Sequence, residues 1–341
     1  MEKRRFLVLD GLRGVAAIAV MSRHLPPYLA SRIILPESYL AVDLFFILSG
    51  FILTHAYEQR LLAGLSLGEF MRVRIIRLGP LYWLAGGLAF VEMHRIANPA
   101  ILNLLFLPAP SDFHVYSLNF PAWSLGCELV ANAIFAAFIH KLRGNLIFIP
   151  IAIGLAGMVV AGVVFGNLQG GPHWSDVWVG YARVMFSFFL GVLIYRKYKK
   201  SQIAFSPIIG LLLPFLLLGL FNITPRWSAI YDIGIVALAF PVILWLGAGA
   251  HVPYRAGQIM GVLGVASYGV YVLQIPLRQF AVFILIHFHI GPTIWASGLF
   301  CIGVIASSIF LDHFFDTPAR RWLMARTKRT NLRQSVAAGE A

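Results

Sequence analysis

An arginine and a histidine near the N-terminus have the residue types and the spacing to act on one substrate. Arg13 and His24 lie in an apolar stretch that predicts a helix over about 6–24. Their eleven-residue separation is within about 20° of three full turns, so both side chains share a face, about 16 Å apart in height. A guanidinium suits anion binding and a neutral imidazole suits general base catalysis. The competing interpretations are a headgroup anchor, with Arg13 paired to Asp10, and an interfacial histidine.

Two carboxylates add to this set. Asp43 lies near the start of an expected helix over 39–57, and Glu128 lies near the start of another over 122–140. Both helices are expected to run from the outer side inwards, so the sequence predicts that both carboxylates lie in an outer layer with His24. Ionisable groups within spanning helices are costly, which makes them functional candidates. For Glu128, a structural hydrogen bond to another helix is the alternative.

An arginine cluster precedes the expected helix over 76–95. In a helix Arg74 and Arg77 share a face, whereas Arg72 shares a face with Arg74 only if the chain is extended there. The cluster is either ordinary cytoplasmic loop charge or a clamp for phosphate groups. With Arg13 between the arginines and the outer layer, this arrangement suits an enzyme that takes an anionic donor from one side of a membrane and acts on an acceptor near the other.

The elements that must position these residues are membrane helices. The 341 residues are 59% hydrophobic and 12% charged, whereas a soluble domain carries about 25% charged residues. A membrane-spanning helix needs roughly 20 mostly apolar residues. We therefore predict an all-α, polytopic bundle of about ten transmembrane helices. The remaining expected helices cover 145–166, 178–195, 205–221, 229–248, 262–286 and 293–315.

The basic residues orient this bundle. Of the 27 lysines and arginines, twenty fall in segments that share one side when the N-terminus is cytoplasmic. Both termini are thus expected in the cytoplasm, with residues 1–317 as a single transmembrane domain and 318–341 as a basic cytoplasmic tail. The net charge of +13 lies in short clusters between apolar runs, so no nucleic-acid partner is expected. Cys127 and Cys301 fall in apolar segments and are expected to be core thiols.

Six segments, in order along nearly the whole chain, resemble the acyltransferase-3 family of membrane O-acyltransferases, many of which acylate bacterial surface or secreted glycans. The segments that carry the resemblance are 9–14 with Arg13 and His24, 39–51 with Asp43, 70–82 with Arg72 and Arg74, 123–128 with Glu128, 267–271, and 316–322. Two positions depart from the family pattern. Leu129 stands where a second acidic residue often follows Glu128, and Gln274 stands where many relatives carry a histidine.

The resemblance implies transfer of an acyl group, with acetyl as the first expectation, from cytoplasmic acyl-CoA to a hydroxyl of a carbohydrate or glycolipid acceptor. The setting it implies is a bacterial inner membrane, with lipid as the surroundings and no metal. Arg72 and Arg74 would bind the donor phosphates, with Arg77 as a helper, and Arg13 would hold the donor deeper. His24 would take the acceptor proton, and an acyl-histidine intermediate stays open.

Some roles stay open at this point. Asp43 or Glu128 would orient the imidazole or bind acceptor hydroxyls, and the sequence does not assign which. The rival class of protein is a membrane carrier or flippase without acyl-transfer chemistry, which the same intramembrane charges would suit. The acceptor and the oligomeric state are not predicted.

Overall fold

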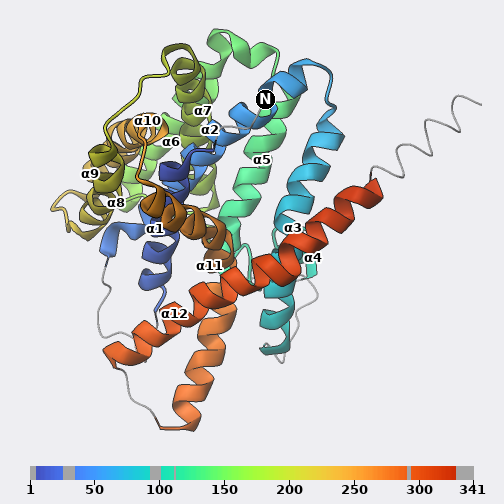
Figure 1. The fold of residues 1–341 in the computed structure, drawn as a ribbon, viewed down its shortest axis with the longest axis vertical. Coiled ribbons are helices and arrows are strands. Elements are labelled where there is room, and N and C mark those ends of the chain that lie inside the picture. The colour runs from blue at the N-terminus through green and yellow to red at the C-terminus, as the bar shows by residue number, and fades with distance from the viewer. Residues whose placement is uncertain (1–4, 26–34, 93–100, 111–112, 290–292, 328–341) are drawn as a thin grey trace, which may run out of the picture.

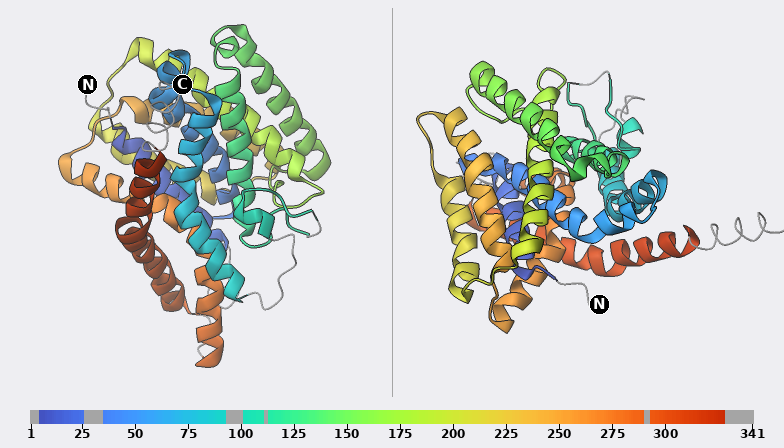
Figure 2. Two further views of the ribbon diagram at one scale, coloured as in Figure 1. Left: turned by 90° about the vertical axis from the view of Figure 1, so that its right-hand side faces the viewer. Right: turned by 90° about the horizontal axis from the view of Figure 1, so that it is seen from above.

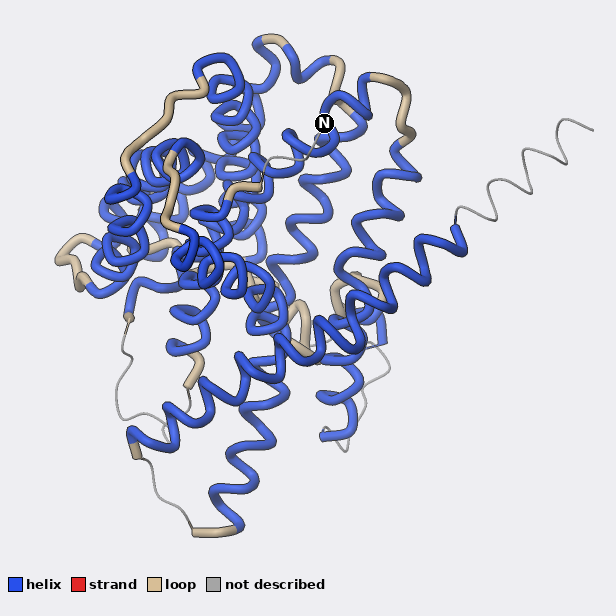
Figure 3. Tube along the Cα trace, viewed as in Figure 1, coloured by secondary structure: helices blue, strands red, loops and turns tan. Residues whose placement is uncertain are grey.

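The structure is a computed structural model that describes residues 5–25, 35–92, 101–110, 113–289 and 293–327. The expected basic residues Lys3 and Arg4, and the last part of the expected tail, lie outside these residues. The described chain is built from helices, as Figure 3 shows in blue, which confirms the all-α fold. The helices are α1 (Leu7–Arg23), α2 (Ala41–Leu62), α3 (Leu67–Glu92), α4 (Ile101–Leu104), α5 (Trp123–Ala137), α6 (Phe148–Phe165), α7 (Val177–Ser201), α8 (Pro207–Asn222), α9 (Ser228–Gly234), α10 (Phe240–Gly249), α11 (Tyr254–His287) and α12 (Ile294–Leu311).

Each of the ten segments expected to be helical forms a helix over most of its described residues. Short 3-10 turns, η1 (Pro36–Leu40) and η3 (Phe120–Ala122), lead into α2 and α5, and a π-helical turn joins α9 to α10. Within the described ranges, seven helical segments are long and apolar enough to cross a membrane. They are 36–62, 120–137, 145–165, 177–201, 228–249, 254–287 and 295–327. The shorter α1 and α8, with 17 and 16 residues, complete the bundle with α3.

Helix α1 lies at the centre of the bundle and packs along α11, while α2 packs along α7 (Figure 1). The α2–α7 contact is close because both helices carry glycine at the crossing. A Cβ atom on Gly50 would lie 1.9 Å from the carbonyl oxygen of Phe188, and one on Gly191 would lie 2.1 Å from that of Ile47. Small residues allow such backbone approach in membrane bundles. Helix α12 lies along the outside of the bundle in both views of Figure 2.

Helix α3 begins nine residues earlier than the expected residue 76. Its start is fixed by a capping box, in which the backbone N–H of Glu69 donates to Ser66 Oγ and the backbone N–H of Ser66 donates to the Glu69 carboxylate, both at 3.2 Å. The arginine cluster is therefore helical. Arg74 and Arg77 share a face, and Arg72 points elsewhere, since two residues turn the helix by about 200°.

Two other boundaries differ from expectation. Helix α11 begins at Tyr254, eight residues before the expected residue 262, and runs through Pro276 to His287. The last helix continues from Trp295 through a π-helical turn, η7 (Asp312–Asp316), to Thr327, so it crosses the expected domain boundary at 317. The start of the expected tail is thus part of the last helix, and the rest of that tail lies outside the described residues.

Candidate active site

A cavity of about 210 Å³ lies between α1, α2, α3, α5 and α11, and we call it the arginine cavity. Apolar side chains of α2 and α5 form part of its wall, and polar groups come from all five helices. The polar lining consists of Asp10, Arg13, Ser49, Arg74, Arg77, Ser124, Glu128, Ser267, Tyr268 and Tyr271. Three guanidinium groups from two helices thus face one enclosed space, which is suited to an anionic or strongly polar ligand.

Arg74 and Glu128 form an ion pair inside the arginine cavity. The Arg74 Nη2 to Glu128 Oε1 distance is 2.8 Å, and both side chains are largely buried, at 12% and 13% exposure. Ser49 Oγ donates to the same oxygen at 2.5 Å. Among the described residues, the buried Arg74 Nε has no hydrogen-bond partner.

Glu128 does not contact His24, with which it was expected to share an outer layer. The early start of α3 places Arg74 two turns into that helix, where it meets α5 from the side. Glu128 lies five residues into α5, about 7.5 Å along its axis from Trp123. The carboxylate therefore meets the arginine cluster rather than the imidazole.

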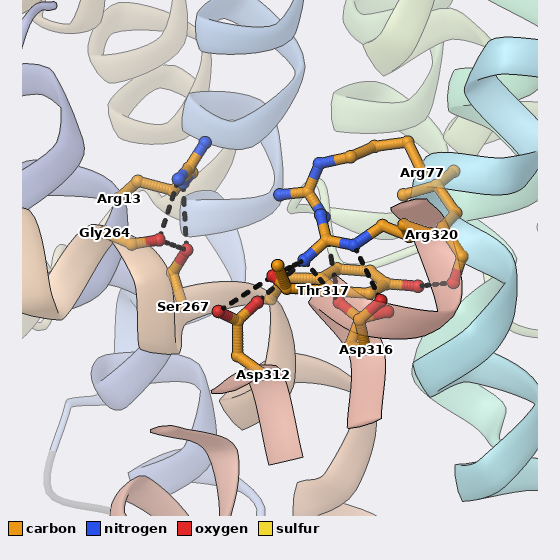
Figure 4. A network of polar contacts seen from close by, with 10 residues as sticks. Arg13, Arg77, Gly264, Ser267, Asp312, Asp316, Thr317 and Arg320 are labelled. Carbon is orange, nitrogen blue, oxygen red and sulfur yellow. Dashed lines mark hydrogen bonds and ion pairs between the residues drawn. The ribbon is translucent and has the colours of Figure 1, made fainter. Parts of the chain in front are cut away.

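Arg13 is held against α11. Its Nη2 donates to the carbonyl of Gly264 at 2.7 Å and its Nε donates to Ser267 Oγ at 2.9 Å (Figure 4). The expected pair with Asp10 is present at 3.6 Å, and Asp10 also binds Arg5 at 2.9 Å. The guanidinium is thus fixed by α11 while it lines the cavity.

Arg77 borders the same cavity and joins a network with the last helix. Its Nη1 lies 4.0 Å from Asp316 Oδ2, and Arg320 lies 2.8 Å from the same oxygen (Figure 4). Arg320 also binds Asp312 at 2.7 Å. Asp316 is 1% exposed and was not among the expected site residues, although it opens the 316–322 segment that resembles the family's terminus.

Arg72, the third expected donor ligand, is exposed and is not part of the cavity lining. The helical conformation of the cluster explains this, because Arg72 faces away from Arg74. Any contact that Arg72 makes with a donor would have to lie outside the cavity, on the surface of the bundle.

A second cavity, of about 440 Å³, lies at the C-terminal end of α1, and we call it the histidine cavity. His24 lines it, with aromatic groups from four segments and polar groups from the 165–176 connection. The main lining side chains are Arg23, His24, Tyr39, Phe120, Trp123, Phe165, Asn167, Gln169, His173, Asp176, Arg183 and Tyr271. Aromatic faces beside amides and charged groups suit a hydroxyl-rich ligand.

Two contacts hold the His24 ring, and a third holds its backbone. Its Nδ1 lies 3.1 Å from Gln274 Oε1, and its ring meets Phe120 edge-on with 5.1 Å between ring centroids. Arg278 donates to the backbone carbonyl of His24 at 3.1 Å. Neither Asp43 nor Glu128 contacts this ring in the described structure, so neither occupies the expected position of a carboxylate that orients the imidazole.

Tyr271 lines both cavities. Its hydroxyl lies 2.7 Å from Ser124 Oγ and 2.8 Å from the carbonyl of Pro121, and its ring packs edge-on against Phe45 at 5.6 Å. The two cavities therefore meet at one buried side chain of α11. The sequence singled out Tyr271 only as part of the 267–271 segment.

Asp43 forms a buried ion pair with Arg183 of α7. The Arg183 Nη2 to Asp43 Oδ2 distance is 2.6 Å, and the two side chains are 1% and 0% exposed. Arg183 also donates to the carbonyls of Tyr39 and Gly170 and lies over the Trp123 ring. The sequence did not indicate Arg183 as the partner of Asp43. The need for a buried charge to have a partner was the available signal.

No cluster of three or more histidine, cysteine, aspartate or glutamate residues that could hold a metal ion occurs in the part of the chain that the structure describes. The candidate site thus consists of guanidinium, carboxylate, hydroxyl, amide and imidazole groups. These groups can bind an anion, orient a hydroxyl and transfer a proton.

The model of an acyltransferase domain, that of the acyltransferase-3 family, matches residues 6–313. The chain therefore belongs to this family and is a multi-pass membrane acyltransferase. Protein 2 in the picA locus of Rhizobium radiobacter is 37% identical over 186 residues, which cover 47% of this chain and 96% of that protein.

Two further relatives match more of the chain. The exopolysaccharide production protein ExoZ of Rhizobium meliloti is 28% identical over 67% of this chain and 73% of its own length. ORF330 of Acidianus two-tailed virus, provisionally named an acetyltransferase, is 24% identical over 82% of this chain and 85% of its own length. No solved structure matches the chain.

Proposed function

We propose that this protein transfers an acyl group, acetyl in the first instance, from acyl-CoA to a hydroxyl of a carbohydrate or glycolipid acceptor. The family supports acyl transfer, and the printed name of ExoZ supports a polysaccharide-related acceptor. We further propose that the membrane is the bacterial inner membrane, with both termini and the arginine cluster on the cytoplasmic side, because most basic residues fall there.

In this proposal the donor enters the arginine cavity. Arg74, with its unpartnered Nε, and Arg77 bind donor phosphates at the cavity mouth, and Arg72 attracts the donor from the surface. The cavity of about 210 Å³ is smaller than the roughly 300–1,000 Å³ of common ligand sites, so it suits the thin pantetheine arm rather than the nucleotide. Arg13 then contacts the arm deeper in the bundle.

The acceptor occupies the histidine cavity. His24 takes the proton of the acceptor hydroxyl while the hydroxyl oxygen attacks the thioester carbonyl. The new C–O bond forms, the C–S bond breaks, and coenzyme A leaves as a thiol after it gains the proton. In this proposal Glu128 holds Arg74 in place and Asp43 holds Arg183. Neither carboxylate orients the imidazole.

The single observation that carries this assignment is that Tyr271 lines both cavities. An anion-binding cavity and an imidazole cavity, which meet at one side chain, are suited to passing a group between two ligands. Helix α1 supports the same geometry, because Arg13 and His24 share one face with about 16 Å between them. A carrier without chemistry would not need a positioned imidazole beside the side chain that lines both cavities.

The test uses purified protein in nanodiscs with acetyl-CoA and an extract of the cell-surface glycan from the same cells. We expect acceptor-dependent release of coenzyme A, and His24→Ala should lower turnover by about 100-fold or more while acetyl-CoA binding stays within about threefold. The matched control is His251→Ala, since His251 is exposed in a connection between α10 and α11. Turnover of His24→Ala near that of wild type would refute the assignment of the base. No coenzyme A release by wild-type protein would favour the carrier.

A further inference from the structure

The buried amide of Gln274 has a different partner at each end. Its Nε2 donates to the backbone carbonyl of Tyr271 at 3.0 Å, one turn earlier in α11. Its Oε1 faces the Nδ1 atom of His24 at 3.1 Å. The side chain is 1% exposed, so water does not compete for either contact. Because a carbonyl engages the amide nitrogen, the oxygen is the end that meets the imidazole.

This orientation decides which ring nitrogen carries the proton. An amide oxygen only accepts hydrogen bonds, so its contact with His24 requires a proton on Nδ1. A neutral imidazole has one N–H, and Nε2 is then left with its lone pair. The nitrogen that can accept the acceptor's proton is therefore Nε2.

The neutral charge of the amide suits this task. A carboxylate at the same place would also accept from Nδ1, but it would favour the protonated ring, which has no lone pair to act as a base. The charged groups nearest the ring are the arginines Arg23, its chain neighbour, and Arg278, which donates to its backbone carbonyl. Phe120 supplies an apolar contact to the ring. Gln274 thus orients the imidazole without placing a negative charge beside it.

We propose that Gln274 is a positioning residue that holds His24 in the Nδ1–H form and leaves Nε2 as the base of the transfer reaction. The proposal rests on the proposed function for its catalytic part, whereas the proton position is a property of the resting protein. Partners of this kind fix the ring and its proton at metal-ligating histidines, where their loss lowers affinity or activity by roughly 10–100-fold, and we expect an effect of that size here.

The test compares Gln274→Met, which keeps the length of the side chain and removes the acceptor, with Gln274→His, whose ring nitrogen can still accept. Histidine-selective ¹⁵N labelling distinguishes a ring nitrogen that bears a proton from one that does not. The His24 signals are assigned as those missing from His24→Ala, in nanodiscs at a pH where the ring is neutral. We expect the Nδ1–H form in the wild type, its loss in Gln274→Met and its return in Gln274→His.

The kinetic measurement runs on the same preparations. Gln274→Met should lower kcat by about 10–100-fold with the KM for acetyl-CoA within about threefold, and Gln274→His should recover at least tenfold of that loss. If Gln274→Met does not fold, Gln274→Asn serves instead, because its amide is one methylene too short to reach the ring.

The outcomes separate the two proposals. An Nδ1–H signal that persists in Gln274→Met overturns the positioning role of Gln274, whatever the activity. Loss of that signal with unchanged kcat overturns Nε2 of His24 as the base, whereas only a wild-type protein that releases no coenzyme A overturns the proposed function. A lower kcat together with a higher KM for acetyl-CoA in Gln274→Met, without a change in the ring signals, would also overturn the positioning role.

Discussion

The buried pair of Asp43 and Arg183 allows a direct separation of structural from catalytic roles. The perturbation is Asp43→Ala, which removes the carboxylate and leaves the Arg183 guanidinium in a site where it is 1% exposed. Removing one partner of a buried ion pair costs about 3–5 kcal/mol, because the other charge stays buried without compensation.

The structure places the expected cost at the lower end of that range. After the substitution Arg183 still donates to the carbonyl of Tyr39 at 2.9 Å and to that of Gly170 at 3.1 Å. The Arg183 guanidinium also stays over the Trp123 ring, with 5.6 Å between its Cζ atom and the ring centroid. We therefore expect a loss of about 3 kcal/mol. At roughly 2 °C per kcal/mol for sizeable chains, the melting temperature should fall by about 6 °C.

The assay is thermal unfolding in detergent, read by the fraction of protein that stays monodisperse, together with acetyl-CoA turnover. The matched control is the double variant Asp43→Leu with Arg183→Met, because apolar groups in place of a whole buried pair are often neutral or stabilising. We expect the double variant to recover most of the melting temperature and to retain turnover within about tenfold.

Two results would refute this reasoning. A melting temperature for Asp43→Ala within about 1 °C of wild type would mean that the pair does not stabilise the fold. A double variant that is as stable as wild type but lacks turnover would mean that Asp43, or Arg183 in the lining of the histidine cavity, takes part in the reaction.

Two further predictions test the donor site and the orientation of the chain. Arg74→Gln should weaken acetyl-CoA binding at least tenfold, about 1.4 kcal/mol, in calorimetry at low salt. Arg72→Gln, on the exposed face, should change this affinity less than threefold. Equal losses of affinity would contradict the cavity as the donor site. In a variant without native cysteines, Ala63→Cys in the α2–α3 turn should react only after the membrane is permeabilised, and Ser175→Cys before α7 should react in intact cells. The reverse labelling pattern would overturn the orientation.

The helices were predictable because the physical signal for them is strong and local. Twenty apolar residues in a row have few alternatives to a membrane helix, and all ten expected segments form helices over most of their described residues. The face shared by Arg13 and His24 followed from helix geometry alone. The boundaries were less predictable, since charged residues hid the start of α3, which the Ser66–Glu69 capping box extends back to Leu67.

Tertiary pairing was the part that the sequence did not specify. Asp43 and Arg183 are 140 residues apart in the chain, and Arg74 and Glu128 are 54 apart. Depth along a helix predicts the layer in which a side chain lies, but it does not give the tilt or rotation of the neighbouring helix. Glu128 consequently meets an arginine from α3 rather than the imidazole of α1.

Carboxylates in and beside the arginine cavity explain how three guanidinium groups lie together. Asp10 contacts Arg13, Glu128 contacts Arg74, and Asp316 lies near Arg77, so each positive charge has an acid beside it in a low-dielectric region. A guanidinium has five N–H donors, and one carboxylate uses only part of this set. The acids therefore hold the arginines in place while leaving part of their N–H donors unused. Binding an anion then adds hydrogen bonds to a site that is already ordered, which keeps the entropic cost of donor binding low.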